Sequence, residues 1–403
     1  MVNIGLLGFG TVGIGVFQIL ESREEELKNI CGCHIKIKKI LVKDLNKNRP
    51  IKVDASIITD NFDEILEDED ISIIIEATGA LEEGYTYISK ALKAGKHVVT
   101  ANKAVVSKHF EELTELADKM DLYFLYEASV GGGIPIIKNL KELLVLNEIV
   151  EIKGILNGTC NYILTKMEEG LNYSEALKIA QEKGFAELDP TDDVEGLDAR
   201  RKLRILGSLA LKAKILEKDI FLRGLRGIGP IDIEYVDKMD GAIRLIGEIK
   251  VSQNGYTAIV EPIIVSKNSP FYNVHNEKNA VLLRGDQVGD LIFYGSGAGR
   301  FPTAHAVLCD VIDIVRGVET IERSLAIREL ENINKTIKGR YYLRLSKSSQ
   351  DIYTILESIA WEVLHKEENI IIMTKDMFLN DILKLIKVLE VKEEDYFLAR
   401  KEG

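Results

Sequence analysis

The sequence predicts an α/β protein whose first domain is a parallel β-sheet covered by helices. Two observations predict this fold class. Over the first 130 residues, short apolar runs of strand length alternate with amphipathic helical stretches, which is typical of parallel sheets. After about Gly131, helical segments are followed by successive strands with no helix between them, and this indicates a second domain of the α+β class.

The strands of the first domain are short and rich in β-branched residues, as expected where both faces of a sheet are buried. We expect them at Val2–Leu7, Ile35–Val42, Ile71–Glu76, Lys96–Thr100 and Leu122–Glu127. The helices are expected at about Gly13–Lys28, Asp63–Glu67, Gly84–Ala94 and Lys108–Lys119. Residues 1–130, with a later segment at about 296–320, form a Rossmann-like dinucleotide-binding domain in this interpretation.

Residues 131–295 are predicted to form the second domain, with a largely antiparallel sheet. Asn254-Gly255 stands between two of its apolar runs and is a strong signal for a β-hairpin. Its helices are expected at about Ile134–Val145, Thr159–Glu169, Tyr173–Lys183 and Gly196–Leu211, and a further helix at Thr303–Arg316. Its strands are expected at Ala242–Val251, Tyr256–Val265, Ala280–Arg284 and Asp290–Tyr294.

The end of the chain is predicted as a third domain, residues 339–403, behind a charged linker at 321–338 (about Arg323–Lys338). Its apolar runs alternate between strand and helix patterns. We expect strand Tyr341–Leu345, helix Asp351–Leu364, strand Asn369–Thr374, helix Lys375–Leu389 and strand Tyr396–Ala399.

Composition excludes several classes of protein. The 64 acidic and 52 basic residues give a net charge of −12, which argues against a nucleic-acid or anionic-membrane surface. Four cysteines in 403 residues make no disulfide framework and favour a cytoplasmic location. Cys31, Cys33 and His34 lack a second ligand pair, so structural zinc is not expected. The uncharged stretch Met1–Leu20 holds five glycines, unlike a signal peptide or a membrane helix.

A G-x-G-x-x-G turn, Gly8 to Gly13, follows the first strand and opens a helix, which is the context of a dinucleotide site. Gly8 permits the tight turn, Gly10 lets the backbone approach a pyrophosphate, and Gly13 lets the helix pack on the strand. The alternative is a glycine-rich turn with no ligand. After the second strand, Lys43 favours NADPH while Asp44 keeps NADH possible. Lys43 and Arg49 could equally lie in a solvated surface loop.

The segment from Gly184 to Lys202 is the most informative. In the helix expected from Gly196, Asp198 and Lys202 lie one turn apart on the apolar face. The polar face should hold Arg200, Arg201, Arg204 and Ser208. Two ionisable groups on an inward face form either a structural ion pair or a functional site. A partly desolvated lysine can donate and accept protons.

Three further segments end predicted strands, where ligands bind in parallel sheets. Lys103, in Thr100–Ala104, can reach a junction between cofactor and substrate. The three glycines after Glu127 expose carbonyls that could bind a hard cation, or they could form only a hinge. Gly295–Gly299 could close the chain back over the nucleotide, or it could be a flexible crossover.

These motifs together resemble homoserine dehydrogenase. They are GFGTVG, GKHVVTANKA, EASVGGGIPII, LNGTCNYIL, GFAELDPTDDVEGLDARRK and GSGAGRFPTA, in order over residues 1–320. The resemblance implies reversible NAD(P)H-dependent reduction of L-aspartate 4-semialdehyde to L-homoserine. This reaction serves threonine, methionine and isoleucine biosynthesis. The resemblance also implies that residues 131–295 are the catalytic and dimerisation domain of a homodimer or higher homo-oligomer.

The resemblance also implies roles for single residues. Lys202 would be the proton donor and acceptor, assisted by Lys103. Substrate would contact Glu187, Asp193, Asp198, Gly158 and Thr159. Carbonyls of Glu127, Val130, Gly132 and Ile134 would hold a sodium ion. We expect the cofactor, NADP in preference to NAD, to contact Gly8, Gly10, Thr11, Val12, Gly13, Lys43, Thr78, Thr100, Lys103, Gly184 and Gly297.

The C-terminal part resembles the βαββαβ ACT regulatory domain of many family members. Its first strand leads into Lys347–Ile352 and not into the usual Pro-Gly-Val turn, which argues against threonine feedback. Regulation by an amino acid and a role in assembly stay equally open for this domain. Phe185 and Cys160 replace a frequent Tyr and Thr of the family. Two other readings stay open: a related NAD(P)-dependent reductase of another small acid, and a non-catalytic sensor of nucleotide and amino acid.

Overall fold

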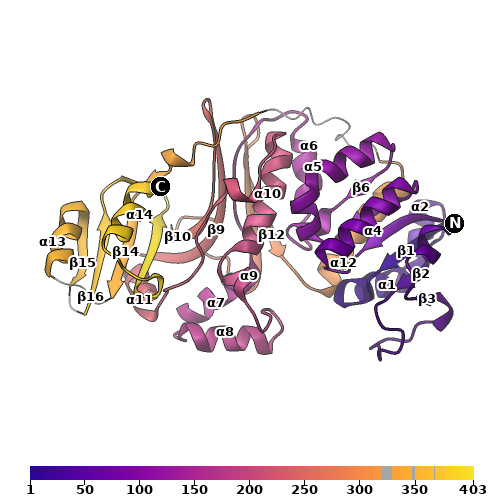
Figure 1. Ribbon diagram of the computed structural model, residues 1–403, viewed down its shortest axis with the longest axis horizontal. Coiled ribbons are helices and arrows are strands. Elements are labelled where there is room, and N and C mark those ends of the chain that lie inside the picture. Colours follow the sequence, from indigo (N-terminus) through magenta and orange to yellow (C-terminus); the bar gives the residue numbers. More distant parts are fainter. Residues whose placement is uncertain (319–328, 347–349, 367) are drawn as a thin grey trace. The chain divides into compact units, whose positions relative to one another are not determined.

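The computed structural model describes residues 1–318, 329–346, 350–366 and 368–403. The chain divides into two compact units (Figure 1). The first unit comprises Met1–Asn147, Ser208–Lys214 and Gly295–Arg328, and the second comprises Glu148–Gly207, Ile215–Tyr294 and Glu329–Gly403. Residues 339–403, which the sequence suggested as a third domain, cluster with the second unit.

The first unit contains the predicted parallel sheet. Its strands are β1 (Val2–Leu7), β2 (Ile35–Leu41), β3 (Ile58–Thr59), β4 (Ile71–Glu76), β5 (His97–Thr100) and β6 (Phe124–Leu125). They are arranged in the order β3-β2-β1-β4-β5-β6. All five neighbouring pairs are parallel, which confirms the predicted architecture. The strand β3 was not predicted because it is only two residues long.

Seven helices belong to the described part of this unit. They are α1 (Thr11–Ser22), α2 (Glu24–Cys31), α3 (Asp63–Leu66), α4 (Leu81–Lys93), α5 (Lys103–Lys119), α6 (Ile136–Leu143) and α12 (Arg300–Val315). The single helix predicted over Gly13–Lys28 is wrong. Arg23 leaves the helical conformation at φ −123° and ψ 22°, so two helices form.

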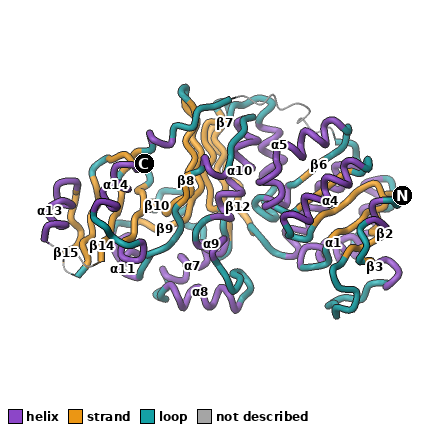
Figure 2. The backbone as a smooth tube through the Cα atoms, in the orientation of Figure 1, coloured by secondary structure: helices purple, strands orange, loops and turns teal. Residues whose placement is uncertain are grey.

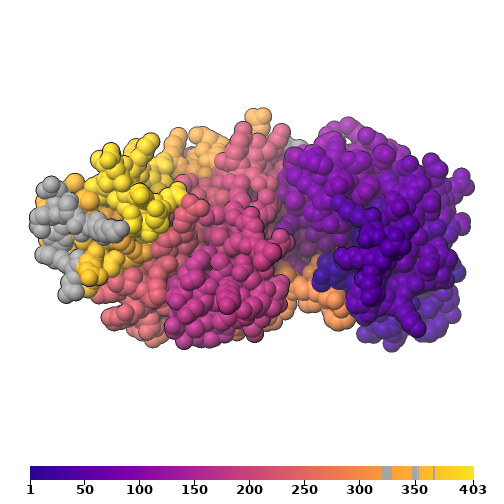
Figure 3. All heavy atoms as spheres, turned by 60° about the horizontal axis from the view of Figure 1, so that its bottom comes forward, coloured from indigo at the N-terminus to yellow at the C-terminus, as the bar shows by residue number. Residues whose placement is uncertain are grey.

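The helices α1 and α12 cover one face of this sheet. Ile4 and Ile73 of the sheet share a buried core with Val16 of α1 and Val307 of α12. In the space-filling view, the orange residues near 300 lie beside the indigo N-terminal segment (Figure 3). A Cβ atom on Gly15 would lie 2.9 Å from that of Ala304, so only glycine permits this close helix contact. The chain therefore returns to the nucleotide-binding half near residue 300, as predicted.

The second unit is built on a long mixed sheet (Figure 2). Its strands include β7 (Ile149–Ile155), β8 (Phe221–Leu222), β9 (Gly241–Ser252), β10 (Gly255–Ser266), β11 (Lys278–Gly285) and β12 (Gly289–Ser296). The hairpin predicted at Asn254-Gly255 is confirmed, because β9 and β10 pair antiparallel from Ser252↔Gly255 onward. The strand β7 was missed because Glu151 and Lys153 interrupt its apolar run. Both are buried in ion pairs.

C-terminal strands extend the same sheet. They are β14 (Tyr341–Ser346), β15 (Ala360–Lys366), β16 (Asn369–Thr374) and β18 (Tyr396–Lys401), and β17 (Met377–Phe378) pairs with β13 (Lys338–Gly339). The strand β18 pairs parallel with β10 at Ile263↔Arg400, and the order continues β10-β18-β14-β16-β15. With helices α13 (Gln350–Ile359) and α14 (Leu379–Val388), the described C-terminal elements follow the order βαββαβ apart from the short β17.

Three predictions for the C-terminal part need correction. The helix predicted over Asp351–Leu364 ends at Ile359, because the β-prone residues that follow pair with β16 as β15. The helix predicted from Lys375 begins only at Leu379, after β17. Residues 321–328 of the predicted linker lie outside the described residues, and so do 347–349 of the predicted turn. Residues 329–338 are anchored, since Asn332 bridges to Tyr256 of β10.

The remaining helices include the predicted Asp198–Lys202 helix, which is α10. They are α7 (Gly158–Glu168), α8 (Tyr173–Glu182), α9 (Thr191–Val194), α10 (Leu197–Leu211) and α11 (Pro230–Lys238). Short 3-10 turns occur at Ala55–Ile57, Glu127–Ser129, Glu217–Asp219, Asn334–Thr336 and Glu393–Asp395. The polar face predicted for α10 is partly wrong, because Arg204 and Ser208 are buried at 1% and 2% exposure. Both have polar interactions that compensate their burial. Among the described residues, no helix is long and apolar enough to cross a membrane.

Candidate active site

The glycine turn has the geometry that a pyrophosphate needs. Gly8 has a φ of +96°, and a Cβ atom there would lie 2.6 Å from the carbonyl oxygen of Ala77. A Cβ on Gly13 would lie 2.2 Å from the carbonyl oxygen of Gly8, whereas one on Gly10 would meet no atom within 4 Å. Gly10 is the N-cap of α1 and no side chain caps the helix. The backbone N–H groups of Thr11 and Val12 therefore begin an uncapped helix N-terminus, which attracts anions.

The two candidate cationic side chains in the loop after β2, Lys43 and Arg49, have different surroundings. Lys43 has a side chain 76% exposed and forms an ion pair of 3.3 Å with Glu83. Arg49 instead folds back on its own loop and donates hydrogen bonds to the carbonyl oxygens of Asp44, Leu45 and Lys47. Of these two cations, Lys43 is therefore the one that its own loop does not hold.

A buried carboxylate organises the carboxyl ends of β4 and β5. Glu76 is fully buried and accepts hydrogen bonds from the hydroxyls of Thr78 at 2.5 Å and Thr100 at 2.6 Å. The amide of Asn102 also reaches Glu76, at 3.4 Å, and donates to the carbonyl oxygen of Ala80 at 2.7 Å. Sequence reasoning found both threonines but missed Glu76 and Asn102. A charged residue at the end of an otherwise apolar strand was the available signal.

Lys103 follows this cluster directly. It is the first residue of α5, partly buried, and Asn102 caps that helix by accepting a hydrogen bond from the N–H of Val105. The cluster around Glu76 therefore fixes where the Lys103 backbone starts. This places Lys103 at the carboxyl edge of the parallel sheet, as predicted.

The turn after Glu127 is held by hydrogen bonds and by close contacts of its glycines. The Glu127 carboxylate accepts hydrogen bonds from the N–H groups of Ile137 and Lys138, at 2.8 and 2.7 Å, and so caps α6. Burial raises the pKa of Glu127. Gly132 has a φ of +55°, and a Cβ atom on it would lie 2.5 Å from the carbonyl carbon of Gly297. The two glycine-rich segments therefore pack directly against each other.

In the second unit, Lys202 and Asp198 form the predicted inward pair. They are 7% and 2% exposed, and Lys202 Nζ donates to Asp198 Oδ2 and to the carbonyl oxygen of Leu156, both at 2.8 Å. Asn157 Nδ2 donates to Asp198 Oδ2 at 2.8 Å and to Asp193 Oδ1 at 2.7 Å. The structure thus brings together Lys202, Asp198 and Asp193. It adds Asn157, which sequence reasoning missed; an asparagine shortly before the predicted helix was the available signal.

The helix α7 begins at this cluster. Asn157 Oδ1 accepts the N–H of Cys160 at 2.7 Å, and Thr159 Oγ1 donates to the carbonyl oxygen of Phe185 at 2.7 Å. A Cβ on Gly158 would lie 2.6 Å from the carbonyl oxygen of Glu277, so this position must stay a glycine. Burial raises the pKa of the Cys160 thiol well above its usual value. Cys160 is therefore a packing residue and not a nucleophile at neutral pH.

Glu187 stands apart from this cluster. Its side chain is exposed on the loop after α8, close in sequence to Gly184, which is also exposed and has a φ of +75°. No described contact joins Glu187 to Lys202 or Asp198. The described residues hold no group of three or more His, Cys, Asp or Glu side chains placed to bind a metal ion. The second unit therefore offers a buried lysine for proton transfer and carboxylates for a cationic group, without such a metal cluster.

The chain matches known proteins over most of its length. Residues 135–312 match the family model "Homoserine dehydrogenase", and residues 8–127 match "Homoserine dehydrogenase, NAD binding domain". The homoserine dehydrogenase of Bacillus subtilis is 38% identical over 87% of this chain and 79% of its own length. The homoserine dehydrogenase of Corynebacterium glutamicum is 33% identical over 97% of this chain and 93% of its own length.

Solved structures agree with these matches. A homoserine dehydrogenase from Thiobacillus denitrificans has a TM-score of 0.91 and 31% identity, and covers 100% of this chain and 98% of its own. A hyperthermophilic archaeal homoserine dehydrogenase in complex with NADPH has a TM-score of 0.67 and 25% identity. It covers 80% of this chain and 99% of its own.

Proposed function

The chain belongs to the homoserine dehydrogenase family, whose members are NAD(P)-dependent oxidoreductases acting on a CH–OH group, and from this premise we propose how its residues carry the reaction. Reduction of L-aspartate 4-semialdehyde to L-homoserine needs one hydride and one proton. The nicotinamide supplies the hydride when bound. The protein must supply the proton, position the substrate and stabilise charge on the substrate oxygen.

Lys202 is the proposed proton donor and acceptor. The observation that carries this proposal is the buried arrangement of Lys202, Asp198 and Asn157, with Nζ held at 2.8 Å by two acceptors. A lysine held in a dry site can transfer a proton at the substrate oxygen, and its charge stabilises the developing alkoxide. Lys103 is proposed to assist from the carboxyl edge of the parallel sheet.

Carboxylates are proposed to hold the substrate ammonium. Asp198 and Asp193 share the amide of Asn157, which fixes both oxygens near the lysine. Glu187 is exposed, so its carboxylate is accessible to an ammonium group. Gly158 and Thr159 lie at the start of α7 beside this cluster and are proposed to contact the substrate.

NADP is the proposed coenzyme. The turn from Gly8 to Gly13 would hold the pyrophosphate, and Lys43 would meet a 2′-phosphate. The archaeal relative was solved with NADPH, which supports this choice. Thr78, Thr100, Gly184 and Gly297 are proposed as further cofactor contacts.

A sodium ion is proposed at the turn after Glu127. The candidate ligands are carbonyl oxygens of Glu127, Val130, Gly132 and Ile134, and neutral oxygens suit a hard monovalent cation. All four residues are buried. The carbonyl of Ile134 already accepts the N–H of Ile136 at 2.8 Å but keeps a second lone pair. The donor set therefore fits such an ion.

We also propose a cytoplasmic homodimer or higher homo-oligomer, formed through the sheet of the second unit. Its product would supply threonine, methionine and isoleucine biosynthesis. The C-terminal elements, with strand order β18-β14-β16-β15, are proposed as an ACT-like domain that serves assembly. The net charge of −12 supports an enzyme of small molecules without nucleic-acid or membrane partners.

Coenzyme oxidation and reduction by the purified protein tests the proposal. Nicotinamide absorbance is followed with L-homoserine and NADP⁺, and then with NAD⁺. We expect turnover, with a higher kcat/KM for NADP⁺. A preference for a hydroxy acid without an amino group would favour a related reductase. A folded protein that binds coenzyme but turns over with neither would favour the sensor.

A further inference from the structure

The second unit contains a cavity whose lining residues are none of those assigned to the reaction. Its volume is about 340 Å³, within the range of small-molecule sites. Its walls are the end of α7, the helix α11, the first residues of β9 and the loop that carries Tyr272 and His275. Apolar side chains form most of these walls: Met167, Leu171, Ile233, Val236, Ala242 and Ile243.

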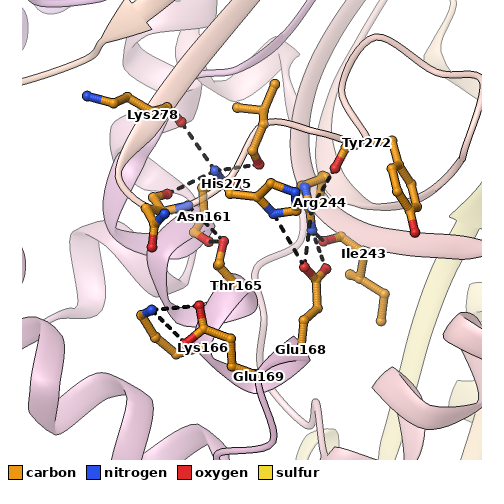
Figure 4. Close-up of polar contacts among 12 residues, drawn as sticks. Asn161, Thr165, Lys166, Glu168, Glu169, Ile243, Arg244, Tyr272, His275 and Lys278 are labelled. Carbon is orange, nitrogen blue, oxygen red and sulfur yellow. Dashed lines mark hydrogen bonds and ion pairs between the residues drawn. The ribbon is translucent and has the colours of Figure 1, made fainter.

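A buried arginine supplies the cationic side of the cavity. Arg244 is fully buried and pairs with the carboxylate of Glu168. It also donates to the carbonyl oxygens of Ile243 and Tyr272, both at 2.8 Å. Figure 4 shows Arg244 and His275 directed at the same Glu168 carboxylate. The Arg244 Nε–H is buried and has no partner among the described residues. A buried donor left unpaired is destabilising, so an oxygen acceptor from a ligand would be stabilising there.

Carboxylates supply the anionic side. Glu168 and Asp237 both line the cavity, and Asp237 is exposed at its surface. Glu168 is already paired with Arg244, and Glu234 also lines the cavity but is paired with Lys238 at 2.6 Å, so Asp237 is the carboxylate that remains for a cation. The cavity thus presents a donor for an anion, a carboxylate for a cation, and an apolar wall between them.

We propose that this cavity binds a small zwitterionic amino acid with an aliphatic side chain. The ligand's carboxylate would accept from Arg244 Nε, its ammonium would face Asp237 at the rim, and its side chain would lie on the apolar wall. An amine or a carboxylate alone satisfies only one of the two polar sides. The charge pattern therefore selects a molecule that carries both groups.

Contacts run from this cavity to the proposed active site. Asn161 of α7 donates to the carbonyl oxygens of Val274, Asn276 and Lys278, at 3.0, 2.9 and 3.3 Å. These bonds fasten the loop with Tyr272 and His275 to the middle of α7 (Figure 4). The same helix starts at Asn157, which holds Asp193 and Asp198. A ligand against this loop should therefore change the KM for homoserine, a consequence that rests on the proposed function.

The test compares L-valine with two matched fragments, isobutylamine and 3-methylbutanoate. Thermal unfolding of the full chain is followed with each probe, and with L-isoleucine, L-leucine and L-methionine. We expect a saturable rise in Tm of about 3 °C or more for at least one amino acid and none for the fragments. No rise with any amino acid overturns the proposal, and so does an equal rise with a fragment.

Variants locate the site. Ile233→Trp fills the cavity and should abolish the rise in Tm, while Ile30→Trp, at an exposed position on α2, should retain it. Asp237→Asn, on the exposed rim, should weaken binding by about tenfold and tests the site even if Ile233→Trp does not fold. A rise retained in both cavity variants places the ligand elsewhere and overturns the proposal.

Kinetic measurements distinguish a failure of the proposed function from a failure of the link between the cavity and the active site. Homoserine turnover without added amino acid tests the proposed function alone. Basal kcat should be unchanged in Asp237→Asn. A saturating amino acid should shift the homoserine KM of the unmodified protein by at least threefold, and not that of Ile233→Trp. A rise in Tm without any shift in KM refutes the link to α7 and leaves the binding site supported.

Discussion

Replacing Lys202 by methionine should nearly abolish catalysis while leaving the coenzyme site intact. Methionine keeps an unbranched side chain but removes the proton and the charge. General acid–base catalysis contributes about 10²–10⁴-fold, so kcat should fall by that factor, or about 3–5 kcal/mol of transition-state stabilisation. Asp198, 2% exposed, would also lose the cation that it faces, while Asn157 would still donate to it. Breaking a buried ion pair costs about 3–5 kcal/mol of unfolding free energy.

A double variant separates the catalytic from the structural effect. Lys202→Met with Asp198→Asn removes both charges and should recover most of the lost stability, because no unpaired ion remains buried. It should not recover kcat. Urea unfolding, coenzyme binding and homoserine oxidation are measured on both variants and on the unmodified protein. A folded Lys202→Met protein that binds NADP⁺ and retains kcat within threefold would refute the proposed proton transfer.

Further predictions concern the coenzyme loop, a half-buried histidine and the C-terminal strands. Lys43→Ala should lower kcat/KM for NADP⁺ by about tenfold and leave that for NAD⁺ unchanged, because one charge-assisted hydrogen bond is lost; Lys47→Ala in the same loop should change neither. Burial lowers the pKa of His97, whose Nδ1 accepts the N–H of Tyr123. The unfolded chain therefore takes up the proton first as pH falls below about 6.5, and stability falls with it. His97→Gln should remove this part of the pH dependence of urea unfolding. Asp232→Ala should lower unfolding free energy by about 3–5 kcal/mol, because the buried Arg344 guanidinium loses its carboxylate; unchanged unfolding would contradict this.

The parallel sheet was predictable because its order follows local patterns. The strands β1 and β4 are short apolar runs, β2 and β5 are short segments rich in β-branched residues, and the glycine turn between β1 and α1 has a fixed geometry. What failed depends on contacts between distant segments. The stretch after Ile359 becomes a strand only because β16 is available to pair with it. Arg204 is buried although the helical pattern placed it on a polar face.

The candidate site likewise contains residues that a local pattern identifies and residues that depend on distant contacts. Lys202 and Asp198 could be found because they are one helical turn apart on an apolar face. Glu76 and Asn157 left only weak local signals, a charge at the end of an apolar strand and an asparagine before a helix, since their roles depend on partners 24 to 41 residues away in sequence. A side chain that joins separate elements carries no periodic signal, so only the folded chain identifies it.

The buried pair itself argues for function over scaffold. An exposed pair one turn apart on a helix contributes little, and a buried pair must offset the desolvation of both ions. Apolar residues of similar size at positions 198 and 202 would extend the apolar face of α10, where Ile205 and Leu209 are fully buried. Stability therefore gives no reason for ions at these positions. Asn157, which ties Asp198 to Asp193 and caps α7, orients the pair in a way that packing does not require. A reaction that needs a proton on Lys202 and a carboxylate on Asp198 in fixed positions explains Lys202, Asp198 and Asn157 together.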